Sequence, residues 1–487
     1  MPSINTTDLS STPLSNYDQR QVYNGLDNCL TNEILTVEHR LLEARPHSQH
    51  IYNFNRALQA PYLEMMRRGF HVNVEARYDA VHQLNLRIGQ LQLQLDRLST
   101  AMMDRPCNPR SRNDLIELFY ERLRLPEVWT SKKGERKMSL DRSALEKLNE
   151  NYLYARPFVS HILAIRDLSK QLEVFTTDID ADNRFRTSYN LAGTETGRPS
   201  SSESAFGSGG NAQNIAPGLR HVFEADTGFR LVVIDFEQSE ARDVGYLIGC
   251  LFGDWSYLDA CESGDLHTAN AKLVWPELPW TGDAGEDRQI AGRSFYRDFT
   301  YRDMAKRGSH LSNYMGTAFT MGRHLKIPQR VAEEFQSRYC KGPRAAFPSI
   351  PRYWQWVIQT IQTQYRIVTP FGRERHFFGN TRDDATAREA IAFLPQSMTS
   401  DRTNLGLWRV WKHLPQVQLL AQGYDSITFQ VPDTDSIDRN IRAVKELLQT
   451  PLTDPKSGRS FTVPVDVKIG YNWGAATRTN PNGLSKY

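Results

Sequence analysis

One stretch of the sequence decides the fold, and it reads Leu231-Val232-Val233-Ile234-Asp235-Phe236-Glu237-Gln238-Ser239-Glu240-Ala241-Arg242. Its four leading aliphatic residues predict a buried strand, so Asp235 falls where that strand meets solvent. A carboxylate in this position is often a metal ligand, but an isolated aspartate more often caps the helix that follows its strand. The interpretation of Asp235 therefore depends on a second carboxylate elsewhere in the chain.

The second carboxylate is Asp425, which stands in a turn-like segment between two apolar runs. The runs are Leu419-Leu420-Ala421 and Ile427-Thr428-Phe429, and the segment between them is Gln422-Gly423-Tyr424-Asp425-Ser426. This pattern predicts a β-hairpin with Asp425 at its tip. Two carboxylates on adjacent strands can hold two Mg²⁺ ions, with Mn²⁺ as a substitute. One ion would lower the pKa of an attacking hydroxyl, and the other would neutralise a triphosphate.

Cationic residues of a predicted helix supply the complementary charge. Arg302, Lys306 and His310 are spaced four apart, so they share one helix face. A triphosphate requires cations at such spacing, because Arg offers a forked contact and Lys offers a point charge that can also donate a proton. Two lone cations more often form a solvated basic face, so this interpretation also depends on the two aspartates.

Size and composition set wide bounds. The 487 residues favour two to four domains, and 59 Lys and Arg against 56 Asp and Glu give a net charge of +3, so no global charge field indicates a polyanionic partner. Basic residues cluster between Arg105 and Lys137, where they could grip phosphates, although such a run alone is more often a solvated loop. Five scattered cysteines favour an intracellular protein with reduced thiols and without structural zinc. The polar amino terminus does not resemble a signal peptide, and no window has the apolar length needed to span a bilayer.

The hydrophobic pattern changes along the chain. From about Ile51 to Asp178 it predicts long helices, and from Arg184 to Ile234 it predicts strands. A helical pattern then continues to Pro370 before the predicted hairpin.

These segments, in this order, resemble the family A DNA polymerases, the bacterial DNA polymerase I family, from about Ile51 to Tyr487. The first family motif is D-Y-S-Q-x-E-x-R, and this chain keeps Asp235, an aromatic residue at Phe236, Gln238, Glu240 and Arg242. The resemblance implies that Asp235, the Phe236 carbonyl and Asp425 bind the metal ions. It also implies that Gln238 and Glu240 line the nucleotide site, where Glu240 blocks a ribose 2′-hydroxyl, and that Arg242 binds DNA.

A second family motif, R-x3-K-x7-Y-G, implies nucleotide contacts from the helix that carries Arg302 and Lys306, with Lys306 catalytic. His310 replaces an aromatic residue that stacks near the incoming base, and Tyr314 matches the distal tyrosine. Met315 stands where the family has glycine.

Further segments match family positions that contact the triphosphate or the primer-template. Asp265-Leu266-His267-Thr268 is similar to D-I-H-T, which implies that His267 contacts the triphosphate. The motifs T-G-R-L-S-S, Q-N-I and T-x-F-G-R-x-R and a glutamine before the last motif imply DNA contacts from Arg198, Gln213, Asn214, Arg373 and Gln396. Arg and Gln in a minor groove can check base-pair shape without reading sequence.

The chain also departs from the family in the first and the last motif. Glu237 stands where the family has serine, and the last motif, usually H-D-E, reads Tyr424-Asp425-Ser426. An aspartate followed by serine also occurs in the related single-subunit RNA polymerases, which are the nearest enzymatic alternative. The other alternative is a non-catalytic primer-template-binding protein. Glu240 favours the DNA polymerase.

The resemblance implies an α+β fold of the right-hand type, with an antiparallel palm sheet, a helical thumb and helical fingers. The expected parts are an N-terminal extension (1–50), a thumb region (51–183), a first part of the palm (184–272), the fingers (273–385) and a second part of the palm (386–487). The implied activity is template-directed addition of deoxynucleotides to a primer 3′-hydroxyl by two-metal phosphoryl transfer. The implied partners are a DNA primer-template and deoxynucleotide triphosphates.

Near the amino terminus, Tyr23 and Asp27 match the Y-x3-D pattern of the third exonuclease motif found upstream of many family members. Only 22 residues precede Tyr23, too few for the other metal-binding strands of a nuclease. We therefore expect an exonuclease remnant, with any proofreading or processivity supplied by a separate protein. The compact chain and its departures suggest a phage protein, hence one in the cytoplasm of a bacterial host.

Overall fold

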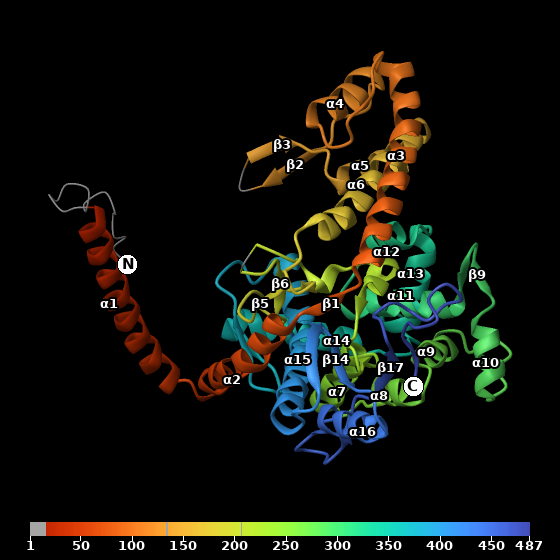
Figure 1. The fold of residues 1–487 in the computed structure, drawn as a ribbon. Helices are drawn as coiled ribbons and strands as arrows, with labels where there is room; N and C mark the ends of the chain where they lie inside the picture. The colour runs from red at the N-terminus through yellow and green to blue at the C-terminus, as the bar shows by residue number, and fades with distance from the viewer. Residues whose placement is uncertain (1–15, 133–134, 206) are drawn as a thin grey trace. The chain divides into compact units, whose positions relative to one another are not determined.

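The computed structural model describes residues 16–132, 135–205 and 207–487, and Figure 1 shows its helices and strands. The chain forms two compact units, one made of the residues up to 59 with 307–398, the other of 60–306 with 399–487. Helices and short strands are mixed along the sequence, so the expected α+β class is confirmed. Within the described ranges, every helix is too short or too polar to cross a bilayer.

The elements have the following bounds. The helices are α1 (Asn16–Glu43), α2 (Pro46–Arg68), α3 (Val74–Met103), α4 (Arg112–Ile116), α5 (Arg142–Asn151), α6 (Arg156–Thr176), α7 (Ser239–Phe252), α8 (Ser256–Glu262), α9 (Leu266–Val274), α10 (Ala284–Ala291), α11 (Tyr301–Asn313), α12 (Ala318–Leu325), α13 (Gln329–Gln336), α14 (Ser349–Gln364), α15 (Asp384–His413) and α16 (Ile437–Leu448). The strands are β1 (Phe70–Val72), β2 (Trp129–Lys132), β3 (Glu135–Met138), β4 (Arg184–Phe185), β5 (Ser188–Asn190), β6 (Ser200–Ser202), β7 (Phe223–Glu224), β8 (Phe229–Phe236), β9 (Ser294–Tyr296), β10 (Phe299–Thr300), β11 (Arg366–Val368), β12 (Glu374–His376), β13 (Gln418–Gly423), β14 (Ser426–Pro432), β15 (Leu452–Thr453), β16 (Ser460–Phe461), β17 (Val465–Gly470) and β18 (Ser485–Lys486).

A five-stranded sheet in the order β13-β14-β8-β17-β18 lies in the second unit, and all its neighbouring strands are antiparallel. β8 is the central strand, and its residues Leu231, Val232 and Ile234 are fully buried. Burying each such side chain contributes roughly 1.5–3 kcal/mol, which explains why this strand is a continuous aliphatic run. The expected antiparallel sheet and the expected β13–β14 hairpin are both confirmed.

Helix α7 follows β8 and packs against α8 at close range. A Cβ atom on Gly245 would lie 2.9 Å from the backbone of Leu258, and one on Gly249 would lie 2.1 Å from the ring of Trp255. Only glycine permits this approach. The contact fixes the helix that begins just after Asp235.

Helices α3 and α6 pack along each other and enclose a separate apolar core in the second unit. The long helices expected between residues 51 and 178 are confirmed. The solvated loop expected in the basic segment is wrong, because β2 and β3 form an antiparallel hairpin in which Trp129 stands opposite Met138. Cross-strand packing of such a pair stabilises a hairpin. Lys133 and Gly134, from the same basic segment, lie outside the described residues.

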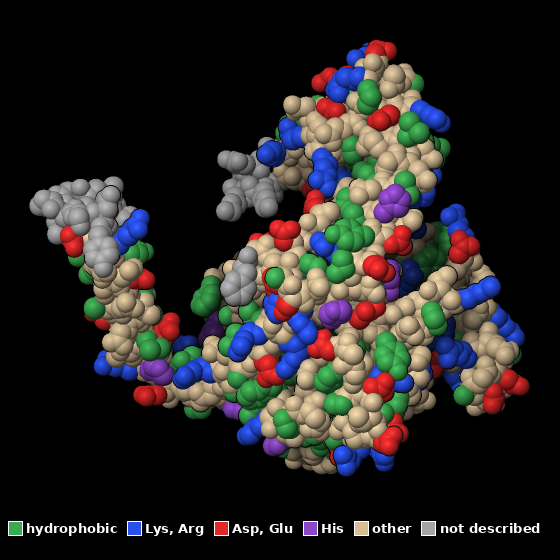
Figure 2. All heavy atoms as spheres, in the orientation of Figure 1, with side chains coloured by type: hydrophobic (Ala, Val, Ile, Leu, Met, Phe, Trp, Pro, Cys, Tyr) green, Lys and Arg blue, Asp and Glu red, His purple; other side chains and the backbone are tan. Residues whose placement is uncertain are grey.

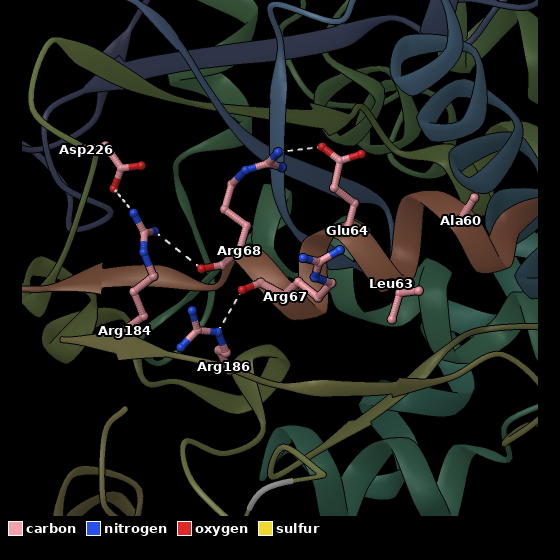
Figure 3. A pocket seen from close by; sticks show the side chains of 8 residues that line it. All are labelled: Ala60, Leu63, Glu64, Arg67, Arg68, Arg184, Arg186 and Asp226. Carbon is pink, nitrogen blue, oxygen red and sulfur yellow. Dashed lines mark hydrogen bonds and ion pairs between the residues drawn. The ribbon is translucent and has the colours of Figure 1, made fainter. Parts of the chain in front are cut away.

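Arginines tie the end of α2 to β1 and β4 (Figure 3). Arg184 donates to the carbonyl of Arg68 at 3.3 Å and pairs with Asp226 at 2.7 Å. Arg186 donates to the carbonyl of Arg67 at 2.7 Å. These side chains line a cavity of 680 Å³. Because the guanidinium groups of Arg184 and Arg186 are hydrogen-bonded to acceptors within the protein, we interpret the cavity as a structural feature and not as a ligand-binding site.

The first unit contains α14, whose buried face is formed by Ile350, Tyr353, Val357 and Ile361. Their spacing of three and four residues is that of one helix face. Tyr353 donates its hydroxyl to the carbonyl of Ile391 at 3.1 Å, which ties α14 to α15.

Charge is distributed rather than segregated on the face drawn in Figure 2, where Lys and Arg side chains are interspersed with Asp and Glu. This agrees with the net charge of +3. Any attraction of a polyanion must therefore be local.

Helix α11 is followed, two residues after its end, by a left-handed residue that is not glycine. Met315 has a φ of 57°, and its N–H donates to the Ser312 carbonyl at 3.1 Å. The next residue, Gly316, donates to the Leu311 carbonyl at 2.8 Å. A Cβ atom on Gly316 would lie 2.6 Å from that oxygen, so glycine is required there for space. The left-handed conformation of Met315 costs roughly 1–2 kcal/mol.

We predict that Met315→Gly raises the free energy of unfolding by about 1 kcal/mol, because glycine adopts a positive φ without steric cost. Urea titration followed by circular dichroism would measure the gain. Met315→Ala is the matched control, because it removes the side chain but keeps the Cβ atom. An equal gain in both variants would mean that the side chain, and not the backbone, is unfavourable there.

Candidate functional site

Asp235 and Asp425 are brought together by the central sheet. Asp235 lies near the end of β8 directly opposite Ser426, the first residue of β14. Asp425 precedes Ser426 in the turn, and its carbonyl accepts a hydrogen bond from the Phe236 N–H at 2.9 Å. Burial and the charge of Asp425 raise the pKa of Asp235 to about 7. Burial and the charge of Glu240 raise the pKa of Asp425 as well.

The turn that carries Asp425 is strained. It is a two-residue connection between Gly423 and Ser426, and Tyr424 has a φ of 55°. Glycine usually occupies the left-handed position of such a hairpin turn. Strain of this kind persists only where the surrounding structure imposes it, and it is concentrated at functional sites. The ring of Tyr424 lies 5.4 Å from the guanidinium carbon of Arg198, within range of a cation–π contact.

The donors at the strand ends fit a hard divalent cation. Carboxylate and carbonyl oxygens are the ligands that Mg²⁺ takes, usually with only one or two carboxylates. Burial is the main cause of the raised pKa of Asp235, and the charge of Asp425 adds to it, so the two carboxylates are close enough to repel each other and a cation would relieve that repulsion. In the part of the chain that the structure describes, no group of three or more His, Cys, Asp or Glu side chains is placed to hold a metal. The fit therefore rests on the two aspartates and the Phe236 carbonyl.

Sequence reasoning missed a third carboxylate beside this pair. Asp466 of β17 lies directly opposite Asp235, on the other side from Ser426. Its carboxylate lies 3.7 Å from the ammonium of Lys468 and 3.6 Å from that of Lys486. The alternation of polar and apolar residues along β17 is a signal that could have identified it.

A cavity of 300 Å³ opens beside the two aspartates. The sheet contributes Val233, Thr428 and Lys468 to its lining. Gln213 also lines it and donates to the carbonyls of Pro199 and Gln422, at 3.1 and 3.2 Å. Gln213, predicted to bind DNA, is thus held at the edge of this cavity by internal hydrogen bonds.

Other predicted DNA-binding residues of the second unit differ in accessibility. Asn214 is exposed, whereas Arg242 is buried and donates to the carbonyl of Glu237 at 3.1 Å. The guanidinium of Arg242 therefore supports the turn before α7, and its contact with DNA stays a prediction. The side chain of Gln238, which precedes α7, has a buried oxygen without a hydrogen-bond partner among the described residues.

Glu240 and Arg198 form an ion pair that the sequence did not predict. Glu240 lies in the first turn of α7, the helix that follows the strand of Asp235. Both side chains are about three-quarters buried, so the pair is only partly screened by solvent. The pair fixes the carboxylate that the resemblance assigns to sugar discrimination.

The predicted triphosphate contacts of the second unit also meet. Arg302 donates two hydrogen bonds to Asp265, at 2.9 and 3.0 Å. Burial would raise the pKa of Asp265, but hydrogen bonds from Arg302 and Thr268 outweigh it and hold the pKa at about 2. Lys306 is exposed one turn further along α11.

His267 is the second residue of α9, the helix that Asp265 caps. Burial lowers its pKa to about 4, and the positive charges of Arg302 and Lys306 add to the effect. Its ring Nδ1 is buried without a hydrogen-bond partner in the described part of the chain. A neutral imidazole with an unpartnered nitrogen beside two cations can help to bind an anion, because the negative charge of the anion offsets the two positive charges.

The remaining predicted site residues belong to the first unit. His310 is exposed, and its ring meets that of Tyr314 edge-on at 5.1 Å. Arg373 is buried and donates to the side chain of Asn55 at 3.4 Å. Gln396 is half-buried on α15. Their roles stay predictions.

The exonuclease-like pair near the amino terminus lies on α1. Tyr23 and Asp27 are both exposed there. Among the described residues they belong to no cluster placed to hold a metal.

Comparison with known proteins identifies relatives of the chain. The profile of DNA polymerase family A matches residues 78–475. The thermostable DNA polymerase I of Thermus thermophilus is 27% identical over 420 residues, which are 80% of this chain and 44% of that protein. DNA polymerase I of Treponema pallidum is 26% identical over 440 residues, covering 86% and 40%. The chain thus spans less than half the length of these relatives.

A solved structure shares the fold. It is the POL domain of Pol1 from M. smegmatis in complex with DNA primer-template and dNTP. The TM-score is 0.67 at 21% identity, and the match covers 86% of this chain and 69% of that one.

We predict that His267 stays neutral in the free protein down to about pH 4, and that a bound triphosphate raises its pKa. Titration of the ring by NMR, with and without the triphosphate, measures both values. Because the folded pKa lies below the ordinary 6.5, the folded state binds fewer protons between about pH 4 and 6.5. The contribution of His267 to the free energy of unfolding therefore falls as pH drops through that window.

His267→Gln should remove this part of the pH dependence, whereas His310→Gln, at an exposed histidine, should keep it. A ring that titrates near 6.5 in the free protein would contradict the burial argument.

Proposed function

Because the chain belongs to DNA polymerase family A, we propose that it extends a DNA primer along a template by adding deoxynucleotides to the primer 3′-hydroxyl. One observation carries the proposal, namely the strand register that sets Asp235 beside the turn of Asp425. A non-catalytic binder has no need of two partly buried carboxylates that repel each other, because the arrangement is unfavourable without a cation.

The two aspartates and the Phe236 carbonyl would hold two Mg²⁺ ions, which Mn²⁺ could replace. When bound, such ions lower the pKa of the primer hydroxyl and neutralise the triphosphate. Two negative charges held side by side give the protein a preorganised binding position for cations. The protein's remaining task is to bind and orient the two substrates.

Arg302, Lys306 and His267 would bind the triphosphate. Arg302 is held by Asp265 in the free protein, so its fork is already oriented before a phosphate arrives. Lys306 is exposed and close enough for its charge to act on His267, and it would donate a proton to the departing pyrophosphate. His267 would accept or donate a hydrogen bond at its unpartnered Nδ1.

Glu240 would exclude a ribose 2′-hydroxyl, and Arg198, Gln213 and Asn214 would contact the primer-template. The support for this role of Glu240 is its ion pair with Arg198, which holds the carboxylate in one place. A carboxylate free to rotate would be a poor steric filter. Arg198 also lies against Tyr424, so it links the first and last motifs.

We assign the five-stranded sheet to the palm of a right-hand polymerase, the α3–α6 region to the thumb, and the helices between the two aspartates to the fingers. The proposed boundaries are those expected from the sequence, at residues 51, 184, 273 and 386. The likeness to a polymerase domain supports this assignment at the level of the fold.

Ser426 after Asp425 favours the alternative of a single-subunit RNA polymerase-like enzyme, because an aspartate followed by serine also occurs in those enzymes. Primer extension with deoxynucleotides and ribonucleotides in parallel distinguishes the DNA polymerase from the RNA polymerase-like enzyme and from the non-catalytic binding protein. Extension with deoxynucleotides supports the proposal, preference for ribonucleotides supports the alternative, and binding without extension supports a non-catalytic protein.

We predict that Asp235→Asn or Asp425→Asn lowers the rate of extension by at least about a hundredfold, while the affinity for primer-template stays within about threefold. The amide keeps the shape but loses the negative charge that a cation requires. Single-turnover extension and fluorescence anisotropy measure the two quantities. Asp466→Asn, at a carboxylate already paired with lysines, is the matched control and should retain most activity.

We predict that Glu240→Ala lowers the ratio of deoxynucleotide to ribonucleotide incorporation by about a hundredfold or more, because space opens beside the sugar. The ratio of kcat/KM values measures the effect. Glu237→Ala changes a carboxylate three residues away and should leave the ratio intact. If both variants kept the parental ratio, a residue other than Glu240 would exclude the 2′-hydroxyl.

A further inference from the structure

A fully buried ion pair joins α7 to α15 in the second unit. Arg402 is 1% exposed and Asp243 is 0% exposed. The guanidinium contacts both carboxylate oxygens, at 2.9 and 2.5 Å. This fork-to-fork geometry defines the distance and the angle between the two side chains.

The ion pair is part of a larger polar layer. Arg402 also donates to the Ser239 hydroxyl at 2.8 Å. Thr399, one turn earlier on α15, donates to Ser239 at 2.8 Å and lies 3.1 Å from Asp243. Ser239 and Asp243 are four residues apart on α7, so the layer holds one face of the first turns of that helix. Glu240 lies between them in the sequence.

The same stretch of α15 also holds the partner of Glu240. Ser400 donates its hydroxyl to the carbonyl of Gly197 at 2.8 Å, and Gly197 precedes Arg198. Consecutive residues of α15 therefore contact both segments that form the Arg198–Glu240 ion pair, Thr399 through side chains of α7 and Ser400 through the backbone before Arg198. A shift of α15 in this region would move the two members of the pair together.

Stability alone does not explain such a layer. A buried ion pair loses about as much free energy by leaving water as it gains by attraction, and apolar residues of similar volume are often equally or more stabilising. Apolar contacts, however, tolerate sliding and rotation, whereas a bidentate pair has one good geometry. The layer is therefore better suited to orient α7 than to stabilise it.

We propose that Arg402 and Asp243 are positioning residues that set the rotation of α7 and hold Glu240 against Arg198, and that they thereby determine sugar discrimination. This inference rests on the proposed role of Glu240 in the polymerase. Neither residue touches the substrate. Their effect is transmitted through Ser239 and the first turn of α7.

The test replaces the ion pair with apolar residues of similar size, in the double variant Asp243→Leu with Arg402→Leu. We expect the variant to fold with a melting temperature close to that of the parent and to extend primers with deoxynucleotides. We expect its ratio of deoxynucleotide to ribonucleotide kcat/KM values to fall by about tenfold, because Glu240 is no longer held in one orientation.

Thr399→Val serves if the double variant does not fold. It removes the hydrogen bonds to Ser239 and Asp243 without changing the volume of the side chain, and we expect a fall of about threefold in the same ratio. Tyr62→Phe is the matched control, because it removes another buried hydrogen bond of α15, from the Tyr62 hydroxyl to Asn404 at 2.7 Å. It should lower stability and leave the ratio unchanged.

An unchanged ratio in a folded double variant and in Thr399→Val would overturn the inference. Glu240→Ala, assayed beside them, separates this failure from that of the proposed function. If Glu240→Ala lowers the ratio and the other variants do not, only the positioning role is lost. If Glu240→Ala also leaves the ratio unchanged, the positioning role fails together with the proposed role of Glu240. If the parent does not extend a primer, the proposed polymerase function is wrong as well.

Discussion

The antiparallel pairing of β8 with β14 is the contact on which the site depends. It sets the end of a buried strand opposite the first residue after a tight turn, so that Asp235 and Asp425 meet although 190 residues separate them in sequence. Their mutual repulsion opposes folding, and it is offset by the burial of the aliphatic residues of β8.

The sheet and the long helices were predictable because local pattern decides them. The aliphatic run before Asp235 can satisfy its backbone and bury its side chains only as an interior strand, and the apolar runs around Asp425 require a hairpin. The basic segment near residue 132 was misread, because its charges resemble a loop while the Trp129–Met138 pair stabilises a hairpin. At Met315 the missing glycine was visible in the sequence, but the backbone conformation that accommodates methionine was not.

The polar contacts of the site were not predictable, because each joins segments that only the tertiary fold brings together. Arg302 and Asp265 are separated by 37 positions, and Arg198 and Glu240 by 42. Arg302, Arg198 and Glu240 had each been assigned a role toward a substrate, and the structure shows that each also has a partner within the protein. Motifs in the sequence indicate which charged side chains the site contains. Which of these charges pair with each other depends on the tertiary fold, which no local pattern encodes.

This pairing bears on how a substrate would enter. In the free protein the forked donors of Arg302 face a carboxylate, so a phosphate that binds there in the proposed reaction would have to compete with Asp265. The competition lowers affinity, but it keeps the arginine oriented and prevents its collapse onto other acceptors, which reduces the ordering that binding requires. The Arg198–Glu240 pair also orients a side chain before the substrate binds. Here, however, the oriented residue is the carboxylate of Glu240, which faces the sugar in the proposed reaction. The Arg402–Asp243 pair is a third ion pair of this kind, but it is fully buried, so solvent does not reach it. In our proposal it therefore keeps α7 in one orientation while Glu240 meets the sugar.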